Sequence, residues 1–230
     1  MKVLLIIPAY NESTNITRLL VDIGRNGNIY DTLVVNDGSE DDTAVKARHK
    51  GAKVLDLPMN LGIGGAVQTG YHYAYSKGYD AAVQVDGDGQ HSPEFIKKLI
   101  EPIENGEADM VIGSRFIENN GFQSSFFRRI GIGYFRGLIR FITGQSISDP
   151  TSGFRACNRA VIEAFTKYYP ADYPEPESIV FLKRKKFRIK EVPVQMRERN
   201  GGISSIRAFR IPYYMIKVTL AILIDKFKKK

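Results

Sequence analysis

Residues 81–91 read AAVQVDGDGQH, a short apolar run that ends in a turn with two carboxylates. The run is apolar apart from Gln84, which is typical of a strand buried on both faces of a sheet. Asp86 and Asp88 follow at once, on either side of a glycine. Ligands of open α/β sheets bind at the carboxyl ends of the strands. We therefore expect this turn to lie at a ligand-binding edge.

Similar apolar runs recur through the first half of the chain and alternate with helical patterns. Further strands are predicted at residues 3–7, 32–35, 53–57 and 110–112. Helices are predicted after the polar residues 11–13, from Asp41 or Asp42, over 65–76, and from Ser92, where Pro93 suits the first helical position. This succession predicts an α/β fold with a mostly parallel central sheet flanked by helices.

The alternation ends after Gly113. Residues 122–143 are basic and aromatic, a late strand is expected at 187–194, and 206–230 is predicted to be a helix with a strongly basic end. We assign residues 1–205 to one α/β domain and 206–230 to a C-terminal element.

The C-terminal segment has the pattern of an interfacial helix. At 100° per residue its polar stripe comprises Arg207, Arg210, Tyr214, Lys217, Ala221, Asp225 and Lys228. Most other residues of 209–224 are apolar, which together with the lysine tail is typical of a helix lying on an anionic membrane. A helix packed on the domain or in a dimer interface is the alternative, and Pro212 either begins the helix or divides it.

The composition suits a globular protein with excess positive charge. The 230 residues are 43% hydrophobic, and 33 Lys and Arg against 25 Asp and Glu give a net charge of +8. That charge favours nucleic acid, an anionic membrane surface or phosphorylated substrates. The single cysteine, Cys157, excludes an internal disulfide framework and a thiolate zinc site, and favours a cytosolic environment. We expect neither a signal peptide nor a membrane-spanning helix.

The Asp86–Asp88 turn is a candidate metal site. Hard carboxylate oxygens at this spacing suit Mg²⁺ or Mn²⁺ held together with substrate phosphates, and Gln90 can add a carbonyl oxygen. A solvated Asp-Gly turn is the alternative for such a pair alone, but its position after a buried strand favours the metal. His91 is expected to be a structural or capping residue.

Three further stretches carry candidate functional groups. Arg115, after the fifth strand, is placed to bind a phosphate bidentately. The basic loop 197–205 (RERNGGISS) can fold over a phosphate with backbone N–H groups and guanidinium groups, although a plain surface loop is the alternative. The prolines of 173–177 (YPEPE) predict an extended segment, in which a carboxylate can face an acceptor or simply be solvated.

Taken together, the motifs resemble those of the family-2 inverting glycosyltransferases of GT-A fold. The branch they resemble most is the polyprenyl-phosphate sugar synthases, such as the dolichyl-phosphate mannose synthases. The resemblance rests on PAYNE at 8–12, NDGS at 36–39, DGDGQH at 86–91, GSR at 113–115, DPTSGFRA at 149–156 and RERNGGISS at 197–205. It covers about residues 3 to 205 in order, so 1–205 is expected to be the GT-A catalytic domain.

The resemblance implies a role for each motif. Binding of the donor's base and ribose is implied for Pro8, Tyr10, Glu12 and Asp37. The divalent metal is implied to lie among Asp86, Asp88 and Gln90, with Asp86 also at the donor. Phosphates of donor and acceptor are implied to meet Arg115, Arg128, Arg197, Arg199 and Ser204. Asp149 is implied to lie near the reacting centre, and Asp149 or Glu177 would be the base if the acceptor is a hydroxyl.

The activity implied is inverting transfer of a sugar from a nucleoside-diphosphate sugar to a polyprenyl phosphate, undecaprenyl or dolichyl. The expected place is the inner face of the cell membrane, bound peripherally from the cytoplasm; no nucleic-acid partner is expected, and homo-oligomerisation stays open. A soluble transferase with a glycan or protein hydroxyl acceptor is the alternative. Asn36 departs from the pattern, because many members carry an aspartate there, so contacts to the base are expected to differ.

Overall fold

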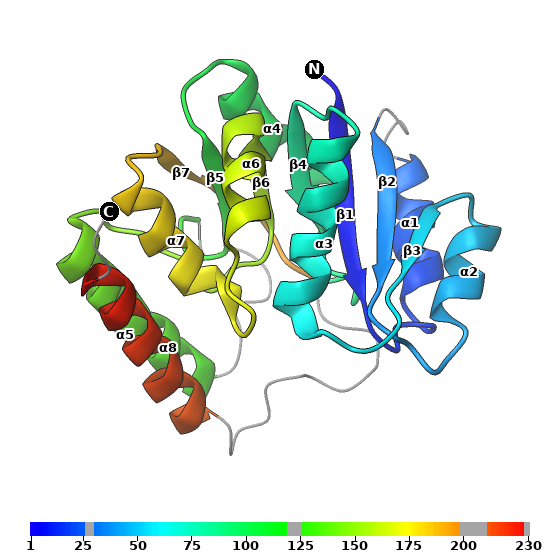
Figure 1. The fold of residues 1–230 in the computed structure, drawn as a ribbon. Helices are drawn as coiled ribbons and strands as arrows, with labels where there is room; N and C mark the ends of the chain where they lie inside the picture. Colours follow the sequence, from blue (N-terminus) through cyan, green and yellow to red (C-terminus); the bar gives the residue numbers. More distant parts are fainter. Residues whose placement is uncertain (26–29, 119–125, 198–210, 228–230) are drawn as a thin grey trace.

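A seven-stranded mixed sheet organises the computed structural model, which describes residues 1–25, 30–118, 126–197 and 211–227. Figure 1 shows the sheet with helices packed on both sides. The strands are β1 Val3–Ala9, β2 Asp31–Asn36, β3 Lys53–Asp56, β4 Ala81–Gln84, β5 Met110–Ser114, β6 Arg155–Asn158 and β7 Ile189–Pro193. Their order across the sheet is β3-β2-β1-β4-β6-β5-β7, and all neighbours are parallel except the pairs made by β6.

Both faces of the sheet are buried, because successive side chains of a strand point to opposite sides. In β1, Leu4 and Ile6 belong to one apolar cluster, with residues of α3, α5, α6, α7 and α8. Val3, Leu5 and Ile7 belong to the other, with α1, α2 and α4. The helices are α1 Ile16–Arg25, α2 Thr43–His49, α3 Gly62–Ser76, α4 Ile96–Glu104, α5 Phe126–Thr143, α6 Arg159–Lys167, α7 Pro174–Arg184 and α8 Ile211–Phe227. The 3-10 turn η1, Pro93–Phe95, precedes α4.

The strand β6 was not predicted. It lies between β4 and β5 and runs antiparallel to both. Its four residues, RACN, contain one adjacent apolar pair flanked by polar side chains, which is too little for a strand pattern. The predicted mostly parallel sheet is confirmed, with this one reversed strand as the correction.

The prediction that residues 173–177 are extended was wrong, because α7 begins at Pro174. Pro174 and Pro176 both lie in the first turn, where backbone N–H groups have no partner within the helix, so proline costs little there. Tyr173 precedes the helix with a φ of 51°. Pro212 is likewise the second residue of α8, so it begins this helix and does not divide it.

The helices α5 and α8 lie side by side at one end of the sheet (Figure 1). The Tyr134 hydroxyl of α5 and the Thr219 hydroxyl of α8 are 2.9 Å apart. Val218 and Ile222 bury one side of α8 in the domain core, and Lys217 pairs with Asp172 before α7. Of the described helices, none has the length and hydropathy that crossing a bilayer requires. The predicted stripe residues Arg207, Arg210 and Lys228 lie outside the described residues.

Gly64, in the first turn of α3, packs directly on the backbone before α7. A Cβ at this position would lie 2.2 Å from the carbonyl oxygens of both Pro170 and Ala171. Because these are backbone atoms, Gly64→Ala should lower the free energy of unfolding by about 1 to 3 kcal/mol. Gly133→Ala in α5 is the control, since a Cβ there meets nothing within 4 Å and alanine favours a helix. Equal unfolding midpoints in denaturant for the two variants would contradict the prediction.

Candidate active site

The turns that follow β1 and β2 are joined by hydrogen bonds at the carboxyl edge of the sheet. Asn11 has a φ of 53°, its backbone N–H donates to the Ser39 hydroxyl at 3.0 Å, and its side-chain oxygen accepts from the Glu40 N–H at 2.9 Å. Gly38 has a φ of 69° and would place a Cβ 2.8 Å from the Asn60 backbone nitrogen. Only glycine fits this close approach, so the PAYNE and NDGS motifs form one rigid surface.

Asp37 lies at the centre of this surface. It is 3% exposed, and its Oδ1 accepts from the Leu61 N–H at 2.7 Å, just before α3. Burial raises the pKa of Asp37, while the N–H groups of Leu61 and Gly62 lower it. Asn36, which departs from the family pattern, donates its side-chain amide N–H to the Asp56 carboxylate at 2.9 Å. Because Asp56 is the last residue of β3, this hydrogen bond connects the turn after β2 to β3.

The predicted donor-binding residues of the first turn differ in availability. Tyr10 is 46% exposed, so its ring is open to a ligand. Glu12 is 8% exposed, accepts from the Asn15 amide, and its backbone N–H donates to Thr43. Glu12 therefore holds the turn together. The Pro8 carbonyl packs against Gly87, where a Cβ would lie 2.9 Å away.

The two aspartates of the metal candidate lie next to this surface. Asp86 accepts from the Gln84 amide at 3.0 Å, and Asp88 accepts from the Gln90 N–H at 3.0 Å. Gly153 closes the space behind Asp86, because a Cβ there would be 3.1 Å from its Oδ2. Within the described residues, no group of three or more His, Cys, Asp or Glu is arranged to hold a metal.

The donor set of this turn nevertheless fits Mg²⁺ or Mn²⁺. Such cations are commonly held by one or two carboxylates plus substrate phosphates. Asp86 keeps 34% of its side chain exposed, and Gln90 uses its amide N–H on the Arg197 carbonyl at 3.4 Å. The Gln84 Oε1 is buried and has no hydrogen-bond partner in the described part of the chain, directly beside Asp86.

Arg115 and Asp149 form a buried pair, not two separate groups. The Asp149 side chain is fully buried and that of Arg115 is 12% exposed. Asp149 Oδ2 accepts from the Arg115 Nε at 2.7 Å, and Oδ1 accepts from its Nη2 at 2.8 Å. The Arg115 backbone N–H and the Thr151 hydroxyl also donate to this carboxylate. The geometry makes Asp149 the partner that orients the guanidinium.

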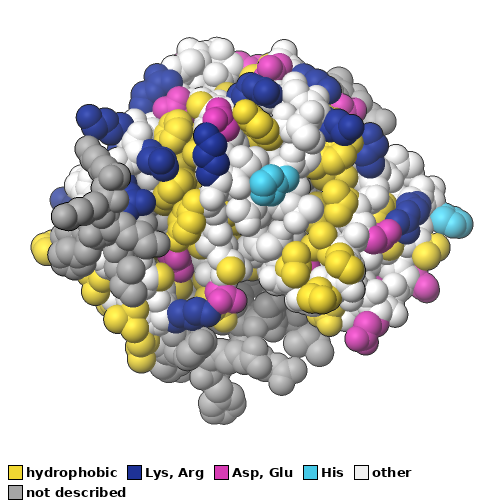
Figure 2. Space-filling view, viewed as in Figure 1, with side chains coloured by type: hydrophobic (Ala, Val, Ile, Leu, Met, Phe, Trp, Pro, Cys, Tyr) yellow, Lys and Arg dark blue, Asp and Glu magenta, His cyan; other side chains and the backbone are white. Residues whose placement is uncertain are grey.

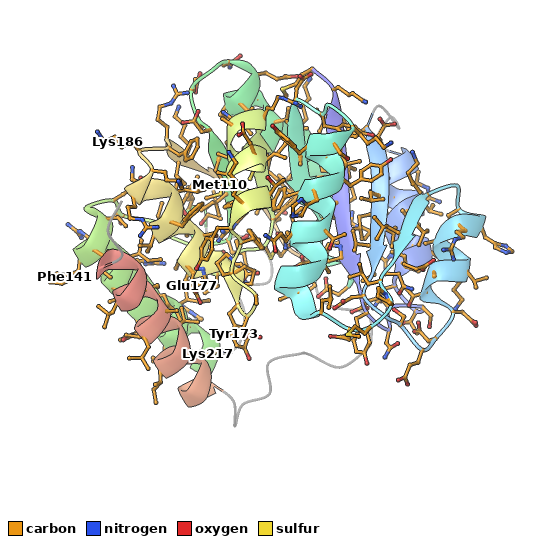
Figure 3. The ribbon with its side chains drawn as sticks, in the orientation of Figure 1. Met110, Phe141, Tyr173, Glu177, Lys186 and Lys217 are labelled. Atoms are coloured by element: carbon orange, nitrogen blue, oxygen red, sulfur yellow. The ribbon has the colours of Figure 1, made fainter. Side chains whose placement is uncertain are left out.

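The other predicted residues lie further from this pair or outside the described chain. The Arg197 guanidinium donates to the Asp22 carboxylate of α1 at 2.6 Å, so in this structure it pairs with a side chain of the protein. Arg128 is in the first turn of α5. Glu177 lies on α7, the helix that packs against α8 (Figure 3). Arg199 and Ser204 fall outside the described residues.

A family profile described as glycosyl transferase family 2 matches residues 4–166. That is more than half of the chain. The chain belongs to glycosyl transferase family 2. The predicted family is thereby confirmed.

Relatives of this family-2 glycosyltransferase align along nearly its whole length. It is 29% identical to UDP-N-acetylglucosamine–dolichyl-phosphate N-acetylglucosaminyltransferase of Methanococcus voltae, covering 96% of this chain and 97% of that protein. It is 32% identical to undecaprenyl-phosphate mannosyltransferase of Micrococcus luteus (95% and 93%). It is 34% identical to dolichol-phosphate mannosyltransferase of Pyrococcus furiosus (94% and 62%).

The fold of the family-2 glycosyltransferase is also found in solved structures. Glucosyl-3-phosphoglycerate synthase from Mycobacterium tuberculosis, crystallised with Mn²⁺, UDP and glucosyl-3-phosphoglycerate, superposes with a TM-score of 0.76 at 20% identity. The match covers 98% of this chain and 79% of that one. The predicted GT-A fold is confirmed.

Glu191 of β7 is a site residue that was not predicted. Its carboxylate accepts from the Ser148 N–H at 2.7 Å, the Ser148 hydroxyl at 2.8 Å and the Asp149 N–H at 2.9 Å. Arg136 of α5 donates to the Ser148 carbonyl at 2.7 Å. The loop that carries Asp149 is thus held from β7 and α5 at once.

A second pair of charges, Arg155 and Glu175, lies near Asp86. Arg155 is 2% exposed and, within the described residues, donates to neutral groups: the carbonyls of Pro150 and Ser152 and the hydroxyl of Ser178. Burial raises the pKa of Glu175 to about 7, the Arg155 charge lowers it, and the Asp86 charge raises it. Arg155 therefore ties the Asp149 loop to α7, with Glu175 as a nearby counter-charge.

Glu175 should make stability depend on pH. Its folded pKa of about 7 lies above the ordinary 4.5, so the folded state keeps the proton longer than the unfolded chain. Its stabilising contribution is therefore full below pH 4.5 and is lost as pH rises through 7. Between pH 5 and 8, the wild type should lose about 2 to 3 kcal/mol of unfolding free energy relative to Glu175→Gln. Denaturant titrations would measure the unfolding free energy of both proteins. The same difference between wild type and Glu175→Gln at pH 5 and at pH 8 would contradict the prediction.

Proposed function

We propose that this glycosyltransferase moves a sugar from a nucleoside-diphosphate sugar to a polyprenyl phosphate, with inversion at the anomeric carbon. The observation that carries the proposal is the buried Arg115–Asp149 pair. A hydroxyl acceptor needs a base within hydrogen-bond reach. Asp149 and Glu177 were the candidates for that role. Both oxygens of Asp149 accept from Arg115, and Glu177 lies on α7, the helix that packs against α8. A phosphate acceptor is already ionised near pH 7 and needs no base.

The relatives support the same acceptor class. The proteins of Methanococcus voltae, Micrococcus luteus and Pyrococcus furiosus are all named for a dolichyl, dolichol or undecaprenyl phosphate. They differ in the sugar, which is N-acetylglucosamine in one name and mannose in the others. The proposal therefore names the lipid phosphate and leaves the sugar to experiment.

The proposed donor site follows the edge of the sheet from β2 to β5. Tyr10 would contact the nucleoside, since its ring is exposed, and the buried Asp37 would hold the binding surface in place through the Leu61 N–H. Asp86 and Asp88, with Gln90, would hold Mg²⁺ or Mn²⁺, whose chemistry is to neutralise charge that develops on the departing nucleoside diphosphate. Arg115 would add a second positive charge at the phosphates, oriented by Asp149.

The test is a donor and acceptor screen with the purified full chain. UDP-glucose, UDP-N-acetylglucosamine and GDP-mannose are each supplied with undecaprenyl phosphate and Mn²⁺ or Mg²⁺, and products are detected by mass spectrometry. A lipid-phosphate sugar formed from one donor is the expected result. Transfer only to a glycan or protein hydroxyl, with none to the lipid phosphate, would overturn the proposal and favour a soluble transferase.

The α5–α8 face is the proposed contact with an anionic membrane surface. We define it by apolar side chains that α5 and α8 leave exposed: Ile130 54%, Tyr134 42%, Phe141 81%, Ile216 62%, Leu220 54% and Leu223 36%. They recur at helical spacing on two neighbouring helices, and hydrophobic side chains are visible along the lower left of Figure 2, over α8. Figure 3 shows Phe141 at the outer edge of α5. A continuous apolar face beside basic residues suits a bilayer.

Charge on this face should weaken membrane binding. Ile216→Glu with Leu220→Glu is expected to lower the partition coefficient for phosphatidylglycerol-containing vesicles by about 100-fold or more, because each side chain loses roughly 1.5 to 3 kcal/mol of burial. Val45→Glu is the control, since Val45 is 52% exposed on α2. Flotation would measure the partition. Unchanged flotation of the double variant would contradict the proposed contact.

A further inference from the structure

His91 is a buried imidazole whose two nitrogens both face one candidate metal ligand. It is 3% exposed and lies five residues after Asp86. The Asp86 backbone N–H donates to the His91 Nδ1 at 3.0 Å. The His91 Nε2 lies 3.7 Å from the Asp86 Oδ2, beyond hydrogen-bond distance. The proposed chemistry assigns no task to this ring.

Two further contacts fix the position of His91. Its ring stacks on Phe154, with centroids 4.7 Å apart and planes 9° from parallel, and Phe154 is fully buried. Its backbone forms a bridge with Met196, and the neighbouring Gln90 carbonyl accepts from the Arg197 N–H at 2.9 Å. The ring therefore connects the metal turn to the start of β6, and the backbone connects it to the segment after β7.

The hydrogen bond determines which nitrogen carries the proton. Because Nδ1 accepts from a backbone N–H, the neutral ring must hold its proton on Nε2. That proton is on the side of the Asp86 carboxylate. The other tautomer would set two N–H groups against each other and would release the Asp86 backbone.

We propose that His91 is a positioning residue, which orients Asp86 for a divalent cation by accepting the Asp86 N–H. The inference rests on the metal site of the proposed function and adds a residue to it. Groups that orient metal ligands from outside the coordination shell typically contribute 10- to 100-fold in metal affinity. The acceptor nitrogen, more than the bulk of the ring, is what the geometry makes essential.

Two variants separate the acceptor from the ring. His91→Asn places an oxygen near the Nδ1 position and loses the stack on Phe154, whereas His91→Phe keeps a flat ring and loses the acceptor. Mn²⁺ binding in the presence of UDP, followed by electron paramagnetic resonance, should weaken about 10-fold or more in His91→Phe. It should stay within about threefold of wild type in His91→Asn. Wild-type affinity in His91→Phe, or equal weakening in both variants, would overturn the inference.

A second measurement does not depend on metal. Nitrogen-15 NMR of the histidine side chains should show His91 with an unprotonated Nδ1 and a protonated Nε2, and the opposite tautomer would overturn the inference. Failure of the wild-type chain to bind Mn²⁺ with either UDP or GDP would instead refute the metal site of the proposed function, and the inference with it. Wild-type binding together with unaffected His91→Phe would refute the inference alone.

Discussion

Replacing Asp88 with asparagine should lower kcat/KM for sugar transfer by about 10³-fold or more. An asparagine oxygen can still accept the Gln90 N–H, so the turn should keep its shape. What is lost is one anionic oxygen where charge develops on the departing diphosphate, and a 10³-fold loss corresponds to roughly 4 kcal/mol of transition-state stabilisation. Mn²⁺ affinity should fall in parallel.

Asp42→Asn is a matched control for this prediction, because Asp42 is an exposed aspartate at the start of α2. The kcat/KM of the two variants would be compared from initial rates at donor concentrations below KM, with lipid phosphate held constant. A rate for Asp88→Asn within tenfold of wild type would contradict the assignment of this turn to the metal.

Asp149→Asn and Arg115→Lys should each lower kcat/KM by about 10²- to 10³-fold, the usual effect of removing one oriented charge-stabilising group. The double variant should be no more than about threefold worse than the more damaged single variant. The reason is that, in the proposed transfer, Asp149 acts on the phosphates through the guanidinium that it orients, so the pair acts as a unit.

A general-base role for Asp149 predicts a different pattern. Asp149→Asn would then be far more damaged than Arg115→Lys, and the two losses would multiply in the double variant. Disrupting a buried ion pair typically lowers the free energy of unfolding by about 3–5 kcal/mol. Thermal unfolding of each variant must therefore be measured with the kinetics, so that a loss of folded protein is not taken for a loss of activity. The comparison also tests the acceptor class, since only a hydroxyl acceptor needs the base.

Much of the fold was predictable because its strands are buried on both faces. Continuous apolar runs marked β1, β2, β4 and β5, and the polar turns after β1, β2 and β4 marked one edge of the sheet. The edge strand β3 is less buried and was marked only by its apolar pair, Val54 and Leu55. The strand β6 gave no such signal, since only Ala156 and Cys157 are apolar within it. The segment with Pro174 and Pro176 was predicted to be extended, whereas it begins α7. Proline is common both in extended chain and in the first turn of a helix, so the sequence alone does not distinguish the two.

The candidate site was predictable where function places a charge in a turn, as for Asp86 and Asp88. It was not predictable where a charged side chain holds a loop or a neighbouring helix in place through neutral groups. Glu191 lies in the middle of β7 and binds a loop more than 40 residues away in the sequence. Arg155 joins the loop at Pro150 and Ser152 to Ser178 of α7, which is 23 residues away. Such long-range pairs leave no local pattern, and only the packing of β6 and β7 brings them together.

The reversed direction of β6 has a consequence for exchanging parts between relatives. Since β5 ends at the ligand-binding edge and the antiparallel β6 starts there, residues 115–154 leave and re-enter the sheet on the same side. The stretch that contains α5 is therefore an insertion with adjacent ends, and a longer or shorter version changes no strand register. Chimaeras that exchange this stretch should keep the strand register and the Asp86–Asp88 turn, and they also replace both members of the Arg115–Asp149 pair.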